Sequence, residues 1–428
     1  MRSLVSALGA VFLGVMLLVG GQGLLNLLVV LRLEHADTPR LLVGAFMATY
    51  FAGQALGAVS VARLVARVGH VRAFAGCLAL ASAVALGHGM DPHPAVLGLL
   101  RLINGMCFVG ALAVAEGWLN DRPPQGARGL VLALYTTAFY LAMGGSQLLA
   151  GLGDPASDRP FMIAGSLLAL GVLPMAFSPA VAPPPPDASF LSPTFLFRRA
   201  PLAVTGALAS GALFSLAITL GPGYLRGHGL EAAAVGRGMA AGLILGLLLM
   251  WPIGWLSDRL DRRRVMQGMA MVMAACSLLS MAAPAAGAAA VGASIVLLTA
   301  WMIPLYPMSL AHAGDRLPAS KLVAGSATLL LLSAVGAAAS PLIGALTMDA
   351  LGPWGLHLVA GLVAAALAAF IAAQRWAVDP VDDQGAFQAL PRSTPATAQL
   401  DPRGDDSPSA EPELRGPAGH EGSPTKGG

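Results

Sequence analysis

Twelve long apolar runs constrain this chain more than any other feature of its sequence. Charged or Pro/Gly-rich breaks separate the runs, which lie near residues 8–31, 41–62, 73–90, 95–119, 129–152, 160–178, 201–224, 233–256, 265–284, 286–311, 322–346 and 355–374. Most approach the roughly 20 residues that a helix needs to cross a bilayer. Only 11% of the residues are charged, against about 25% in soluble domains. The sequence therefore predicts an all-α integral membrane protein with twelve transmembrane helices.

The basic residues between the runs predict the orientation of the helices. One side of the membrane receives only Arg32, Arg40, Arg159, Arg226 and Arg237. The other side receives Arg2, Arg63, Arg67, Arg72, Arg122, Arg128, Arg198, Arg199, Arg259, Arg262, Arg263, Arg264, Arg316 and Lys321. Positive residues favour the cytoplasmic side, so an even number of spans places both termini in the cytoplasm of a cell whose inner (plasma) membrane holds the chain.

Composition also divides the chain into segments. Residues 179–200 contain PPPPD and end in two arginines, which predicts an exposed cytoplasmic linker between two six-helix halves, residues 1–178 and 201–374. Two such pseudo-repeats are the architecture expected where halves rock about a central site. Residues 375–428 are rich in Pro, Asp, Gly, Ser and Thr, which predicts a disordered cytoplasmic tail.

Two loops share a pattern in which an apolar helix ends near a Gly and a basic cluster. The first, at 62–72, reads ARLVARVGHVR, and the second, at 251–265, reads WPIGWLSDRLDRRRV. Both approach G-x-L-x-D-R-x-G-R-R. Here the chain resembles the major facilitator superfamily, whose loops between helices 2 and 3 and between helices 8 and 9 carry this pattern. The residues kept are Arg67, Gly69 and Arg72 in the first copy and Gly254, Asp258 and Arg259 in the second.

The resemblance implies a two-halved major facilitator fold and transport of a small solute by alternating access. It also implies that Asp258 contacts the start of helix 5, where Arg128 offers a cation; Ala66 replaces the aspartate of the first copy. WPIG at 251–254, LYP at 305–307 and VAEGW at 114–118 make the chain similar to the YcaD-like branch of bacterial carriers.

Four polar residues within the apolar runs are candidate substrate ligands. Arg101 lies about 9 Å below the membrane surface if its helix begins near residue 95, where a buried cation needs a cavity or a partner. Asn104 shares its face, and Gln22 and Asn26 on the first run lie at a similar depth. The resemblance places helices 1, 4, 7 and 10 around a central cavity. The alternatives are an arginine that snorkels to the headgroups and amides that only bond between helices.

Weaker candidates complete the predicted site. Tyr306 is a possible substrate ligand, although such a residue is more often part of the packing. Glu116 and His312 are the remaining ionisable candidates in the runs, so proton coupling would depend on them or on Arg101. The alternative for Glu116 is an ion pair with Arg128 or another loop cation.

Several functional classes lack their signatures. No Walker loop, H-E-x-x-H, C-x-x-C or G-x-S-x-G motif is present, and the three cysteines are isolated, so we expect no enzyme, no cofactor and no metal site. The basic residues flank apolar runs and do not form a nucleic-acid-binding face. The expected partners are a small solute, the lipid bilayer and protons as a candidate coupling ion, with a monomeric chain. A carrier fold that senses a ligand without transporting it is the alternative function.

Overall fold

The computed structural model describes residues 2–90, 93–120, 128–154, 156–177, 190–374 and 384–391, and all of these ranges except the last consist of helices and the short turns that connect them. The first half contains α1 (Arg2–His35), α2 (Arg40–Val68), α3 (His70–Gly89), α4 (Pro94–Asn120), α5 (Arg128–Leu148), α6 (Arg159–Leu170) and α7 (Val172–Ala176). The second contains α8 (Pro193–Arg199), α9 (Pro201–Gly227), α10 (Ala232–Ser257), α11 (Arg262–Ser280), α12 (Ala288–Met302), α13 (Leu305–Gly314), α14 (Leu322–Leu351) and α15 (Gly355–Gln374). Short 3-10 turns cover Leu149–Leu152, Ala283–Ala286 and Ala319–Lys321.

The predicted number of spans is confirmed when two broken helices are each counted once. The run at 160–178 divides into α6 and α7, and the run at 286–311 divides into α12 and α13, where Pro304 and Pro307 lack the N–H that a continuous helix needs. Eleven of the described spans are long and apolar enough to cross a membrane. The twelfth is α11, which begins with three arginines and packs against α15 and α12.

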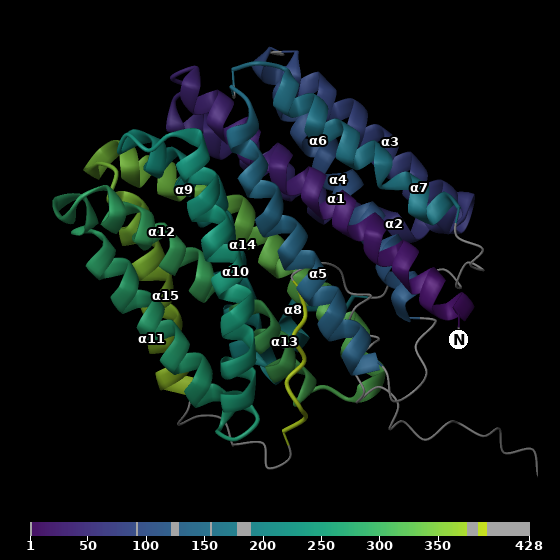
Figure 1. Ribbon diagram of the computed structural model, residues 1–428. Helices are drawn as coiled ribbons and strands as arrows, with labels where there is room; N and C mark the ends of the chain where they lie inside the picture. Colours follow the sequence, from purple (N-terminus) through teal and green to yellow (C-terminus); the bar gives the residue numbers. More distant parts are fainter. Residues whose placement is uncertain are drawn as a thin grey trace, which may run out of the picture.

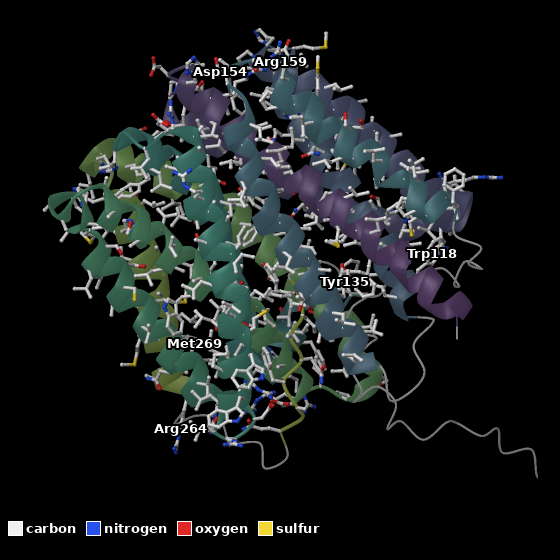
Figure 2. The ribbon with its side chains drawn as sticks, in the orientation of Figure 1. Trp118, Tyr135, Asp154, Arg159, Arg264 and Met269 are labelled. Carbon is white, nitrogen blue, oxygen red and sulfur yellow. The ribbon has the colours of Figure 1, made fainter. Side chains whose placement is uncertain are left out.

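The helices form two bundles, α1–α7 and α9–α15, that lie side by side in Figure 1. They meet where α2 packs on α14, α5 on α10 and α1 on α9. Figure 2 shows Asp154 and Arg159 at one end of the molecule and Arg264 at the other. We call the end with Arg264 the predicted cytoplasmic end and the end with Asp154 the opposite end.

The two bundles approach closely at the opposite end. A Cβ atom added to Gly44 would lie 2.8 Å from the carbonyl oxygen of Pro341, and one added to Gly151 would lie 2.8 Å from the Cβ of Ala233. Only glycine allows such contact between backbones, the form of packing that small residues permit in lipid. At the same end, an ion pair of 3.2 Å between Arg40 and Asp349 connects α2 to α14. The two bundles are therefore in direct contact at the opposite end.

The structure differs from the sequence expectation in the linker and the tail. The last residues of the linker form α8, in which Leu196 is fully buried, because PTFLFRR carries apolar residues that pack on α9. Within the tail, residues 384–391 adopt an extended conformation between α5 and α10, the yellow segment of Figure 1, and Leu390 is only 3% exposed. The rest of the predicted linker and tail, residues 179–189, 375–383 and 392–428, lies outside the described residues.

Candidate functional site

A network of four buried polar side chains joins α1 to α4. The Nε2 of Gln22 donates to the Oδ1 of Asn26 at 3.0 Å and to the Oδ1 of Asn104 at 2.9 Å. Asn104 returns a bond from Nδ2 to the Oε1 of Gln22 at 3.0 Å. Arg101 donates from Nη2 to the Oδ1 of Asn26 at 2.5 Å. The predicted patch of Gln22, Asn26, Arg101 and Asn104 is therefore one hydrogen-bonded unit in the structure.

Helical spacing and close packing place this network. Gln22 and Asn26 are four residues apart, and Arg101 and Asn104 are three apart, so each pair shares one face of its helix. A Cβ atom added to Gly57 would lie 2.8 Å from the carbonyl oxygen of Met106, which shows how closely α2 approaches α4. This approach puts the ring of Tyr50 4.6 Å from the guanidinium carbon of Arg101.

A cavity between the bundles lies next to the network. The residues that line it come from α1, α2, α4, α5 and α9: Val19, Gln22, Gly23, Asn26, Tyr50, Gln54, Phe108, Phe139, Tyr140, Met143, Phe214 and Ile218. The polar part of this wall consists of amides and tyrosines, while aromatic and aliphatic groups form the remainder, as is typical of small-molecule sites.

Arg101 stands behind this wall. Its side chain is fully buried, and Asn26 and Tyr50, which do line the cavity, separate it from the open space. Its contacts are to the amides of Asn26 and Asn104, the sulfur of Met47 and the face of Tyr50, and its Nε has no hydrogen-bond partner among the described residues. None of these groups carries a full negative charge. The guanidinium therefore brings a positive charge to the cavity wall, and it does not snorkel in this conformation.

Tyr306 is not brought to the cavity. It lies on α13, is 5% exposed, and belongs to a separate cluster with Leu196, Ala203 and Leu329. Its role as a substrate ligand remains a prediction without support from this geometry, because a position on a helix does not specify which neighbour the side chain meets.

The two residues predicted for proton coupling also lie away from the cavity lining. Glu116 is fully buried, and its Oε1 accepts a 2.5 Å hydrogen bond from the hydroxyl of Tyr135, which Figure 2 labels. The alternative partner, Arg128, has a side chain outside the described residues. His312 is 3% exposed on α13, close to the positive charges of Arg262, Arg263 and Arg316. Proton coupling through either residue stays a prediction.

The two loops that match the superfamily pattern, which we call the gating loops, contain Arg67 and Gly69 in the first and Asp258 and Arg259 in the second. Gly69 ends α2 with φ of +83°, a conformation that favours glycine. Arg259 stacks on Trp255, with 3.9 Å between its guanidinium carbon and the ring centroid. Arg67 is exposed. Asp258 accepts a 2.7 Å hydrogen bond from the backbone N–H of Phe387, a residue of the tail. Its predicted contact with Arg128 involves a side chain that is outside the described residues.

Sequence reasoning missed a buried ion pair beside this loop. Arg262 is 1% exposed and forms an ion pair with Asp315, whose side chain is 2% exposed. It also donates to the Oγ of Ser257 at 2.9 Å and to the carbonyl oxygen of Ala311 at 3.1 Å. Because Arg262 belongs to a run of three arginines, the sequence predicts only a charge that flanks a membrane span. Its partner Asp315 is 53 residues further along the chain, so no local spacing in the sequence indicates the pair. Asp258 lies 3.8 Å from the same guanidinium.

Asp261 begins α11 next to this pair. Its carboxylate accepts a 2.9 Å bond from the backbone N–H of Arg263, so it caps the helix. Burial acts to raise the pKa of Asp261, but hydrogen bonds from Arg263 and the charges of Arg263 and Arg264 outweigh it and hold the pKa below its usual value. A glycine stands at this position in the family pattern, so the departure supplies a helix cap.

No metal centre is formed by the described residues, which contain no group of three or more His, Cys, Asp or Glu side chains placed to hold an ion. Cys77, Cys107 and Cys276 form no disulfide. The first two are buried and the third is half-buried.

The fold and the polar centre define a multi-pass membrane carrier with two six-helix halves. The family model of the Major Facilitator Superfamily matches residues 11–341, and the chain belongs to this superfamily. It is therefore a secondary transporter with a small-molecule substrate.

Relatives of known sequence and structure agree with this assignment. The chain is 30% identical over 350 residues to the uncharacterized MFS-type transporter YcaD of Salmonella dublin and of Salmonella gallinarum, with 78% of this chain and 87% of the relative aligned. The nucleoside transporter NupG has a similar fold, with a TM-score of 0.68 and 14% identity over 88% of this chain and 99% of NupG. A bacterial homolog of the human lysosomal transporter Spinster also has a similar fold. The TM-score is 0.69 and the identity is 16%, over 87% of this chain and 96% of the homolog.

Proposed function

We propose that this transporter carries a small solute with an anionic or strongly hydrogen-bond-accepting group. The observation behind the proposal is the fully buried guanidinium of Arg101, whose contacts in the described residues include no carboxylate. A charge in a low-dielectric site acts over several ångströms, so an anion beside Asn26 and Tyr50 would be stabilised even with Arg101 one layer behind. The amides of Gln22 and Asn26 would orient the solute.

A solute screen tests this proposal. Purified protein would be heated with matched series of carboxylates, neutral amides and amines of similar size, at several pH values. A ligand that binds only the folded state stabilises it by RT ln(1 + [L]/Kd), so anionic members should raise the unfolding temperature as their concentration rises. If amines or neutral amides stabilise the protein and no anion does, the assignment of charge preference is wrong.

The charge count and the packing support a proposal for the orientation and the working cycle. We propose that the predicted cytoplasmic end faces the cytoplasm of a bacterial inner membrane, because the sequence assigns fourteen basic residues to that side of the membrane and five to the other. The bundles touch at the opposite end, so this conformation would be inward-facing. Transport would then require the contact around Gly44 and Pro341 to open while the predicted cytoplasmic end closes.

Reporter fusions test the orientation. Fusions after Leu33 or Pro155 should report an external location, whereas fusions after Arg72, Ala188 or Asp382 should report the cytoplasm. An external signal at Ala188 would contradict the division into two halves joined by a cytoplasmic linker, whatever the solute screen gives.

A further inference from the structure

The tail returns to the membrane domain and occupies a groove between the two bundles. Residues 384–391 lie between the predicted cytoplasmic ends of α5 and α10, seen as the yellow segment of Figure 1. The tail residues Phe387, Gln388 and Ala389 lie beside Gly129, Leu132, Ala133, Thr136 and Thr137 of α5 and beside Leu247, Met250, Trp251, Gly254, Trp255 and Asp258 around α10. One wall thus comes from each half of the transporter.

Side chains of the membrane domain bind the tail through its backbone. The hydroxyl of Thr136 donates to the carbonyl oxygen of Ala389 at 2.7 Å, and the carboxylate of Asp258 accepts from the N–H of Phe387, also at 2.7 Å. At Gly385, the carbonyl oxygen accepts from Arg262 at 2.7 Å and the N–H donates to Asp315 at 3.3 Å. The bound residues 385, 387 and 389 alternate along the segment, which is the periodicity of an extended strand.

One apolar side chain adds specificity. The ring of Phe387 lies against Gly254, where an added Cβ atom would be 2.5 Å from Cδ1 and 3.0 Å from Cε1. Only glycine at 254 leaves room for the ring in this position. The neighbouring tail residue Ala386 is exposed, whereas Leu390 is buried.

We propose that the groove is a binding site for the chain's own segment 384–391, and that the bound segment inhibits the transporter by holding the two halves apart. The segment is bound to α5 through Thr136 and to the α10 loop through Asp258, so the groove cannot close around it. Asp258 is also the residue that the superfamily pattern assigns to the closed contact with α5. The tail and that contact therefore compete for one carboxylate.

This proposal rests on the alternating-access function, because the groove must close for the opposite end to open. Its test uses no solute, so a failed solute screen leaves the outcome readable. The readout is the opening of the opposite end, which the tail does not touch. Ala233 faces Gly151 across the interface there. In a chain without its native cysteines, Ala233→Cys should react with a membrane-impermeant maleimide only when that end opens.

Truncation after Asp382 should raise the labelling rate of Ala233→Cys by about fivefold or more, the factor equivalent to one net hydrogen bond. Phe387→Asp should do the same, and the matched change Ala386→Asp, one residue away and exposed, should not. Thr136→Val should also raise the rate, because it removes the hydroxyl that donates to the carbonyl oxygen of Ala389.

Adding the segment back as a peptide distinguishes the loss of inhibition from damage to the fold of the truncated chain. A tethered segment has an effective concentration on the order of mM, so the peptide QGAFQALP at mM concentration should return the truncated chain to slow labelling. The same peptide with Phe387→Asp should have no effect. Equal labelling of the full-length and truncated chains, or a truncated chain that the peptide does not slow, would overturn the proposal.

Discussion

Arg101→Ala is expected to remove the anion-dependent stabilisation of the protein and to lower solute affinity at least about tenfold. A positive charge about 7 Å from an anion contributes roughly 2 kcal/mol at an effective dielectric constant of about 20, and tenfold corresponds to about 1.4 kcal/mol. The change deletes the only described cation next to Asn26 and leaves two amide oxygens, on Asn26 and Asn104, with fewer donors. Arg101→Lys should restore part of the effect, since a point charge lacks the planar fork that the guanidinium presents.

The measurement is the shift in unfolding temperature against concentration of the best anion from the screen, with transport in proteoliposomes as a second readout. Arg159→Ala, an exposed arginine at the opposite end, is the matched control and should behave as the parent. Each variant must first elute as a single species in detergent. An Arg101→Ala chain that inserts, folds and responds to the anion like the parent would show that the cation serves packing alone.

Much of the architecture could be predicted because the bilayer imposes one length on every span. Apolar runs of about 20 residues, read with the basic loops, give the number of helices without knowledge of their contacts. The breaks within α6–α7 and α12–α13 depend on local backbone chemistry, as at Pro304. Those breaks lie inside continuous apolar runs, so hydropathy alone does not reveal them.

The four-residue network could be predicted for a related reason. Depth along a helix follows from counting residues, and polar groups at equal depth in lipid tend to find one another. Counting does not give the rotation of each helix, however, and so it does not show that Arg101 lies behind Asn26. The same limit explains Tyr306, which has a suitable helix but faces the cluster around Leu196.

The tail contact could not be inferred from composition. Its bonds go to backbone atoms of Gly385, Phe387 and Ala389, and any sequence supplies such atoms. The partners Thr136 and Asp258 lie more than a hundred residues away along the chain. A segment poor in apolar residues cannot form its own core, yet here it adds to a groove that other helices have already built.

Arg262→Ala is expected to lower the free energy of unfolding by about 3–5 kcal/mol, the range found when one member of a buried ion pair is removed. The side chain of Asp315 is 2% exposed and would keep its negative charge without this cation. The bonds from Arg262 to Ser257, Ala311 and Gly385 would be lost as well. Unfolding in mixed micelles of increasing denaturing detergent would measure the loss.

The same cluster provides the control. Arg264 stands two residues away, is exposed, and contributes equally to the charge that orients the helices. Arg264→Ala should therefore change the unfolding free energy by no more than about 0.5 kcal/mol. The double change Arg262→Ala with Asp315→Ala should cost less than the sum of the single changes, since neither then leaves a buried charge. Equal, small effects at 262 and 264 would mean that both arginines act only as topology signals. A large effect at 262 alone would mean that one residue of the cluster ties the start of α11 to the end of α13, beside the groove where the tail binds.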